Sequence, residues 1–134
     1  MKQAKEQLSG RYLTQMKQSF ARYFSEMTGE QQAVFTMDGS FAVKMRRAGV
    51  SRAQEAFSTG QRDVIALCAR LALVDALFEG EAPFLVLDDP FTNLDDRTVE
   101  RAAALLMAAA EKYQILYLTC HSSREALCCA AEQA

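Results

Sequence analysis

The strongest constraint on the fold is a pair of short apolar runs that flank an alanine-rich segment. FLVLDDPFTNLDD, residues 84–96, begins with four apolar residues and continues into two aspartates and a turn. The alanine-rich segment follows, and QILYLTC, residues 114–120, is the second apolar run. We therefore predict strand 84–88, helix 96–112 and strand 114–120. This is a βαβ unit with parallel strands, a right-handed crossover and a first strand covered on both faces.

The chain before this unit predicts two helices and a hairpin. Apolar residues recur every three or four positions through residues 1–28, which indicates a long amphipathic helix. Two β-type runs around Asp38-Gly39 predict a hairpin over residues 33–46. The segment RRAGVSRAQEAF, residues 46–57, has no clear period and is expected to be a loop. Residues 60–78 return to a helical pattern, and the sequence after Ser122 predicts a last helix.

Composition supports one globular domain in a reducing compartment. A chain of 134 residues, half of them apolar and a quarter charged, suits a single α/β domain over residues 1–134. It has no apolar run near the roughly 20 residues that span a bilayer, so we expect no membrane partner. The four cysteines show no Cys-x-x-Cys spacing, which favours a reduced, cytoplasmic protein.

The net charge of −2 conceals an asymmetry along the chain. Residues 1–52 carry nine Lys or Arg against four Asp or Glu, whereas residues 53–134 carry six against thirteen. A basic first part could contact nucleic acid or an acidic partner, but a solvated helix face explains most such excesses equally well. Both interpretations remain open from sequence.

Polar residues gather at the carboxyl ends of the two predicted parallel strands. Asp88 and Asp89 end the first strand, and His121, the one histidine of the chain, follows the second. Ligands of open parallel sheets bind at this edge. A single Asp there would simply start a turn or cap a helix, but two adjacent carboxylates repel each other and favour a cation or a shared proton nearby. Mg²⁺, held by one or two carboxylates together with phosphates, suits such a site.

The segment FSTGQRD, residues 57–63, begins the predicted helix at residues 60–78. Ser58 with Gln61 forms a capping box, which is the simple structural interpretation. The same helix start also presents free backbone N–H groups to an anion, and Gly60 would let an oxyanion approach the backbone. Asp95 and Asp96 precede the next predicted helix, and at least one of them is expected to cap it.

The order and spacing of these segments resemble those of ABC-type ATPases. Phe57 to Gln61 resembles the signature loop, Phe84 to Asp89 the Walker B strand, Asn93 to Asp95 the D-loop, and His121 the switch histidine. The run is most similar to the branch that contains SMC, RecF and RecN, with bacterial SMC-like proteins of the YhaN type nearest. The motifs cover roughly residues 55–125, and the helix over 1–28 would mark the re-entry of a coiled-coil arm.

The resemblance implies a role for each motif residue. Asp88 would hold Mg²⁺, Asp89 would orient the attacking water, and His121 would sense the γ-phosphate. The signature residues Ser58, Thr59, Gly60 and Gln61 would contact ATP bound on a second head. Asp95 would couple the two sites across the dimer. Asp89 stands where the family usually has a glutamate, which is one methylene longer, so the position of the water is altered.

The resemblance also implies that the active site is divided. The chain has no G-x-x-x-x-G-K-[ST] loop to hold the β-phosphate. We therefore expect a C-terminal lobe, partial in the P-loop NTPase fold, whose N-terminal lobe lies earlier in a longer protein. ATP hydrolysis is expected only when both lobes are present, with a second head and, through the whole protein, DNA as partners in repair or chromosome maintenance.

Two other classes of protein remain as alternatives. One is a non-catalytic dimerisation or adaptor module with an ATPase-like fold, which would have no need of Asp88, Asp89, Ser58 and His121 at these positions. The other is a flavodoxin-like receiver or regulatory domain, which has an acidic pocket at its strand ends but needs no signature loop.

Overall fold

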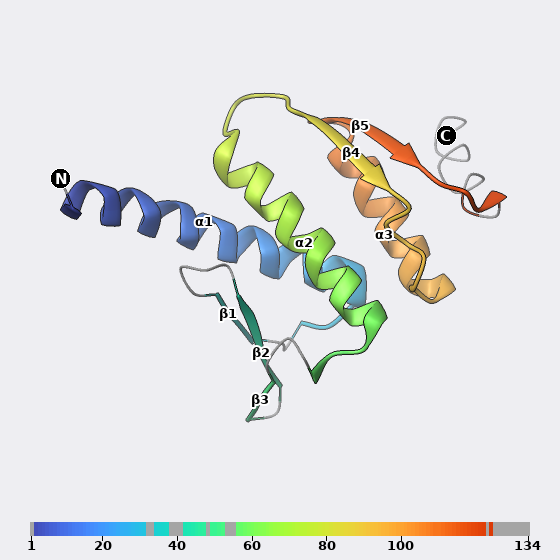
Figure 1. Cartoon of the computed structure of the whole chain (residues 1–134), viewed down its shortest axis with the longest axis horizontal. Helices are drawn as coiled ribbons and strands as arrows, with labels where there is room; N and C mark the ends of the chain where they lie inside the picture. The colour runs from blue at the N-terminus through green and yellow to red at the C-terminus, as the bar shows by residue number, and fades with distance from the viewer. Residues whose placement is uncertain are drawn as a thin grey trace.

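The computed structural model describes residues 2–31, 34–37, 42–47, 49–52, 56–122 and 124. The turn predicted at residues 38–39 and nearly all of the last predicted helix lie outside these residues. The described elements, in chain order, are α1 (Lys2–Thr28), β1 (Val34–Met37), β2 (Val43–Arg47), β3 (Val50–Arg52), α2 (Thr59–Leu77), β4 (Phe84–Asp88), α3 (Asp96–Ala109) and β5 (Gln114–Leu118) (Figure 1).

The predicted βαβ unit is present. Strands β4 and β5 pair in parallel, with Phe84 opposite Gln114 and Asp88 opposite Leu118. Helix α3 connects them and ends at residue 109 rather than 112, and β5 ends at residue 118 rather than 120. The carboxyl ends of both strands therefore lie side by side, as the sequence predicts.

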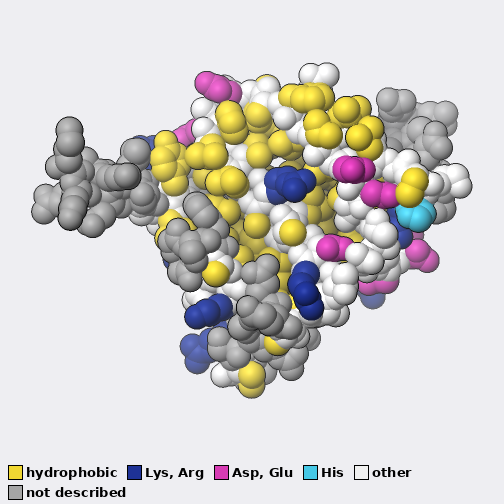
Figure 2. Space-filling model, in the orientation of Figure 1, with side chains coloured by type: hydrophobic (Ala, Val, Ile, Leu, Met, Phe, Trp, Pro, Cys, Tyr) yellow, Lys and Arg dark blue, Asp and Glu magenta, His cyan; other side chains and the backbone are white. Residues whose placement is uncertain are grey.

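The prediction that β4 is covered on both faces is wrong. Leu85 and Leu87 are buried, but the alternate residues Phe84 and Val86 are about half exposed, at 57% and 47%. Leu116 and Leu118 of β5 are exposed to a similar degree. Figure 2 shows hydrophobic side chains over this part of the surface. The apolar run indicates a strand made for two covering layers, and the described part of the chain supplies one of them.

Strands β1 to β3 form a separate antiparallel sheet in sequential order. The register of β1 with β2, from Val34 opposite Arg46 to Met37 opposite Val43, confirms the predicted hairpin strands. The prediction of a loop over residues 46–57 is wrong in part, because Val50–Arg52 forms β3 against β2. Gly49 makes the turn with a φ of 81°, a conformation that glycine adopts readily.

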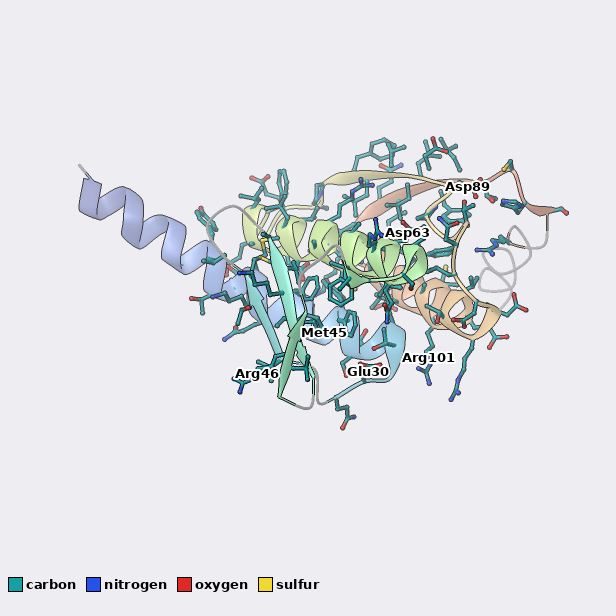
Figure 3. All side chains as sticks on the ribbon, turned by 60° about the horizontal axis from the view of Figure 1, so that its bottom comes forward. Glu30, Met45, Arg46, Asp63, Asp89 and Arg101 are labelled. Atoms are coloured by element: carbon teal, nitrogen blue, oxygen red, sulfur yellow. The ribbon has the colours of Figure 1, made fainter. Side chains whose placement is uncertain are left out.

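Helix α1 joins the two sheets through a common core. It packs along α2 and α3, and its Phe20 and Phe24 meet Phe35 of β1 edge to face, at ring-centroid distances of 4.8 and 4.5 Å. The helix ends at Thr28 as predicted, with Gly29 at a φ of 75°. Its first turns extend beyond the rest of the molecule in both ribbon views (Figures 1 and 3). None of the described helices is long and apolar enough to cross a membrane.

A carboxylate ties these helices to the start of β5. Asp75 of α2 accepts hydrogen bonds from the hydroxyls of Tyr23 on α1 and Tyr113 before β5, and from the guanidinium of Arg22 at 3.1 Å. Its side chain is 11% exposed. One acidic group therefore connects three segments that are distant in sequence.

Candidate functional site

The first group of candidate residues lies where β4 and β5 end. We call Asp88, Asp89, Thr119, Cys120 and His121 the strand-tip cluster. Parallel pairing places Asp88 opposite Leu118, so the residues that follow each strand meet at one edge of the sheet. Figure 2 shows acidic side chains and the histidine gathered at this end of the molecule, and Figure 3 labels Asp89 there.

Asp89 is held firmly by its neighbours. Its backbone has a φ of 44°, unusual for a residue other than glycine, and its N–H donates to the carbonyl of Leu118 at 2.7 Å. One carboxylate oxygen accepts from the Thr119 hydroxyl at 3.0 Å, and the other accepts from the Cys120 thiol at 2.8 Å. The second oxygen also lies 3.9 Å from Nε2 of His121. The predicted meeting of Asp89 and His121 is therefore present.

These bonds shift two pKa values in opposite directions. The hydrogen bond from Cys120, with a smaller contribution from Thr119, holds the pKa of the Asp89 carboxyl below its usual value. The same bond raises the pKa of the Cys120 thiol. At neutral pH Asp89 is thus a charged acceptor. Because a carboxylate offers about four lone-pair positions, it retains capacity to accept a hydrogen bond from water.

Asp88 differs from Asp89 in that its carboxylate is free. It is the last residue of β4 and is exposed, and its side chain makes no hydrogen bond or ion pair with any residue in the described part of the chain. An unengaged hard oxygen ligand beside a second carboxylate fits Mg²⁺ with several retained waters. The donor set of the two aspartates is therefore compatible with the predicted metal.

The second group of candidate residues surrounds the start of α2. Ser58 is the N-cap, with its Oγ accepting the Gln61 N–H at 3.2 Å and its own N–H donating to the Gln61 side chain at 3.1 Å, so the predicted capping box is confirmed. The N–H groups of Thr59 and Gly60 have no hydrogen-bond partner among the described residues. The Ser58 hydroxyl also retains its proton as a donor, because the cap uses it only as an acceptor.

Gly60 has a structural role in addition to the predicted contact with an anion. A Cβ at this position would lie 2.6 Å from the carbonyl oxygen of Asn93, so the absent side chain lets the segment before α3 approach α2. Asn93 also donates through its side chain to Asp63 of α2 at 2.7 Å. Residues 63 and 93 are not related by any local spacing, so this contact could not be predicted from the sequence.

Asp95 acts as the N-cap of α3, as one of the two predicted capping residues. Its carboxylate oxygens accept from the backbone N–H of Thr98 at 2.9 Å and from the Thr98 hydroxyl at 3.0 Å. The first of these bonds is the main reason that the pKa of Asp95 lies below its usual value. The carboxylate is held within its own helix, and because it is exposed it retains capacity to accept a further hydrogen bond from outside the helix.

In the part of the chain that the structure describes, the pocket at the start of α2 does not extend to the strand-tip cluster. A pocket of about 530 Å³ is lined by residues 58–61 and 93–95, with Phe24, Met45, Phe57 and Ile65 among its apolar walls, but no residue of the strand-tip cluster lines it. In Figure 3, Asp89 lies at the strand ends, away from Met45 and Glu30 beside this pocket. The chain therefore presents two separate sets of phosphate- and metal-compatible groups.

The fold resembles that of part of the SMC head domain. A structure from work on ATP-driven dimerization and DNA-stimulated activation of SMC ATPases superposes with a TM-score of 0.71 and 23% identity, covering 87% of this chain and 74% of that one. The Smc head of Pyrococcus furiosus with an extended coiled coil, bound to the C-terminal domain of ScpA, gives 0.68 and 21%, covering 88% and 30%. The resemblance to SMC heads that the motifs suggest is thus confirmed for the fold.

A sequence relative points to the same group of proteins. The DNA replication and repair protein RecF of Synechocystis is 39% identical over 70 residues, which are 50% of this chain and 17% of RecF. The chain therefore spans less than a fifth of this relative's length. No family model matches the chain.

Proposed function

We propose that the chain is the C-terminal lobe of an SMC- or RecF-like ATPase head, acting in the cytoplasm in DNA repair or chromosome maintenance. The observation that carries the proposal is the division of the candidate residues. The free carboxylate of Asp88 and the charged carboxylate of Asp89 lie at the strand tips. A set of hydrogen-bond donors suited to a phosphate lies at the start of α2, in a pocket that none of the described strand-tip residues lines. Two heads that exchange these surfaces would each complete the site of the other.

The strand-tip cluster would supply the hydrolytic half of each site. Asp88 would hold Mg²⁺, which when bound neutralises charge on the phosphates of ATP. Asp89, charged and oriented by Thr119 and Cys120, would accept a hydrogen bond from the attacking water. His121 would donate to the γ-phosphate. Positioning and electrostatic stabilisation account for most of the catalysis in phosphoryl transfer, which suits this set of residues.

The start of α2 would supply the other half. The N–H groups of Thr59 and Gly60, the Ser58 hydroxyl and the positive end of the helix dipole form a donor set for the γ-phosphate on the second head. Gln61 would hold Ser58 through the capping box. Asp95 and Asn93 would transmit contact across the dimer through the close packing of their segment against Gly60.

Hydrolysis by this chain alone is not expected. The β-phosphate has no P-loop here, so the N-terminal lobe of the same head is the first partner and the second head is the other. The competing function is that of a dimerisation or adaptor module without catalysis. The fold and the exposed apolar face of the β4–β5 sheet are equally compatible with such a module. It would not depend on the donors around Ser58.

Dimerisation driven by ATP separates the two functions. The chain would be joined to the P-loop lobe of its own protein to give a completed head, with Asp89→Asn to slow hydrolysis. We expect ATP to convert this head from monomer to dimer, and Ser58→Arg to abolish the conversion by filling the donor site. Gln18→Arg, the same gain of charge on an exposed face of α1, is the control. Dimerisation that does not depend on ATP, or that still occurs in the Ser58→Arg variant, would favour the adaptor module.

A further inference from the structure

The strand-tip cluster contains a sulfur and a nitrogen metal ligand, which Mg²⁺ does not prefer. Oδ2 of Asp89, Sγ of Cys120 and a ring nitrogen of His121 all lie within 4.8 Å of one another. The oxygen is 2.8 Å from the sulfur and 3.9 Å from Nε2. One carboxylate, one thiol and one imidazole are three of the ligand types that zinc binds in proteins, whereas Mg²⁺ prefers oxygen alone.

The distances match a single ion with small adjustments. Zinc bonds of about 2.0–2.3 Å in a tetrahedron set neighbouring ligand atoms about 3.5 Å apart. The Asp89–Cys120 pair would open by about 0.7 Å and the Asp89–His121 pair would close by about 0.4 Å. Sγ of Cys120 and the ring nitrogen of His121 lie within 4.8 Å of each other and would close by up to about 1.3 Å. Both Cys120 and His121 are exposed side chains that follow the end of β5, so an ion can reach them and they can adjust.

A second layer of contacts orients these donors. The Thr119 hydroxyl donates to Oδ1 of Asp89 and leaves Oδ2 directed at the other two residues. The same hydroxyl oxygen accepts the backbone N–H of His121 at 3.1 Å. The bond from the Asp89 N–H to Leu118 fixes the other side of the cluster. Partners that hold ligands in this way are a regular feature of metal sites.

We propose that Asp89, Cys120 and His121 form a site for Zn²⁺ that inhibits the ATPase. The ion would take one bond from each residue, with the thiol proton released to solvent and water in the fourth position. It would thereby occupy the carboxylate that orients water and the histidine that senses phosphate. Binding rests on the residues of this chain alone, whereas inhibition rests on the proposed function.

Cobalt(II) spectroscopy tests the site without any activity. The chain would carry Cys128→Ser and Cys129→Ser, so that Cys120 and the buried Cys68 are the remaining thiols. We expect a thiolate-to-cobalt charge-transfer band and tetrahedral visible absorption that saturate at a single ion per chain and disappear when Zn²⁺ is added. Cys120→Ser should remove the charge-transfer band, and His121→Gln should remove the tetrahedral signal.

The variants also distinguish a built site from an adventitious one. Thr119→Val, which keeps the shape but removes the hydroxyl, should weaken Zn²⁺ binding about 10- to 100-fold. Unfolding curves check that each variant is folded. A cobalt spectrum that is unchanged in Cys120→Ser or in His121→Gln would overturn the metal site. A Zn²⁺ affinity that is unchanged in Thr119→Val would overturn the positioning role of Thr119.

Turnover of the completed head tests inhibition separately. With Mg-ATP in excess and free Zn²⁺ buffered, we expect zinc to lower turnover of the wild type at least tenfold. Because Cys120 also orients Asp89, Cys120→Ser is compared with its own zinc-free rate, and we expect zinc to leave that rate unchanged. Full turnover with zinc bound would overturn the inhibitory role. A completed head with no turnover at all would contradict the proposed function instead, and the cobalt result would stand by itself.

Discussion

Gly60 decides how closely α2 and the segment before α3 can pack. Its missing Cβ leaves room for the carbonyl oxygen of Asn93, which would otherwise lie 2.6 Å away. The hydrogen bond from Asn93 to Asp63 holds the same two segments together. Because the phosphate-type donors and the segment that would face a second head meet here, a change at this residue affects both.

Gly60→Ala should destabilise the chain and displace the segment around Asn93. Since backbone blocks the new methyl group, we expect the free energy of unfolding to fall by about 1–3 kcal/mol, measured by urea denaturation. Gly10→Ala is the matched control, because Gly10 lies in α1 with nothing within 4 Å of a Cβ. That change should stabilise the helix by about 0.5–1 kcal/mol. Equal effects at both positions would contradict the packing role of Gly60.

At this scale the sequence predicts the residues of the site better than their partners. Asp89 and His121 follow adjacent parallel strands, so their meeting could be predicted from the βαβ pattern alone. The bonds of Asp89 to Thr119 and Cys120 depend on a positive φ and on side-chain rotamers, which have no periodic signal. The capping box of Ser58 and Gln61, in contrast, lies within four consecutive residues, so it could be predicted from the sequence.

Among the elements, α1 is fixed to the rest of the lobe by Asp75. The carboxylate lies mostly out of solvent and accepts from Tyr23, Tyr113 and Arg22, while the aromatic rings of α1 pack on β1. If α1 is the root of a coiled-coil arm, as we propose, this contact is where movement of the arm would reach the strand that leads to the strand-tip cluster.

The contact predicts a loss of stability at high pH. Burial, together with the bond to Asp75, raises the pKa of Tyr113 from 10.0 to about 12, and the pKa of Tyr23 is also raised. The unfolded chain therefore loses the tyrosine protons first, so this stabilisation is complete below pH 10 and is lost as the pH rises towards 12. Urea denaturation across this range should show the decline.

Tyr113→Phe identifies the source of that decline. This substitution should lower the free energy of unfolding by about 1 kcal/mol at neutral pH, and the difference in that free energy between variant and wild type should shrink above pH 10. Tyr12→Phe, on an exposed tyrosine of α1, should leave both the stability and its pH dependence unchanged. A difference between Tyr113→Phe and wild type that stays constant to pH 12 would contradict the raised pKa.

The periodicity of apolar residues correctly predicts the type of element where the segments are long, as in helices α1 and α2. Strand β3 was missed because its three residues pair through the backbone, and the segment that contains it has neither apolar alternation nor a marked turn. The run of β4 indicates a strand with two covered faces, yet the described chain covers one. The prediction of two covered faces is therefore wrong for the described chain, and under the proposed function the N-terminal lobe would cover the second face.

The whole molecule thus has an exposed apolar sheet face, formed by Phe84, Val86, Leu116 and Leu118. No described strand pairs with the outer edge of β5 either. We expect the chain to self-associate at high concentration through this face or edge. Leu116→Lys should shift sedimentation towards monomer, whereas Tyr12→Lys, on α1, should not. A monomer at high concentration would contradict self-association.

The central claim is that each ATP site draws residues from two heads. Completed heads carrying Ser58→Arg lack one half of the site, and those carrying Asp88→Asn lack the other, so each should be inactive alone. In an equal mixture each mixed dimer has one complete site, so turnover should return to a measurable fraction of wild type, about a quarter if the heads pair at random. An inactive mixture, or Ser58→Arg heads that hydrolyse ATP by themselves, would contradict a site shared between heads.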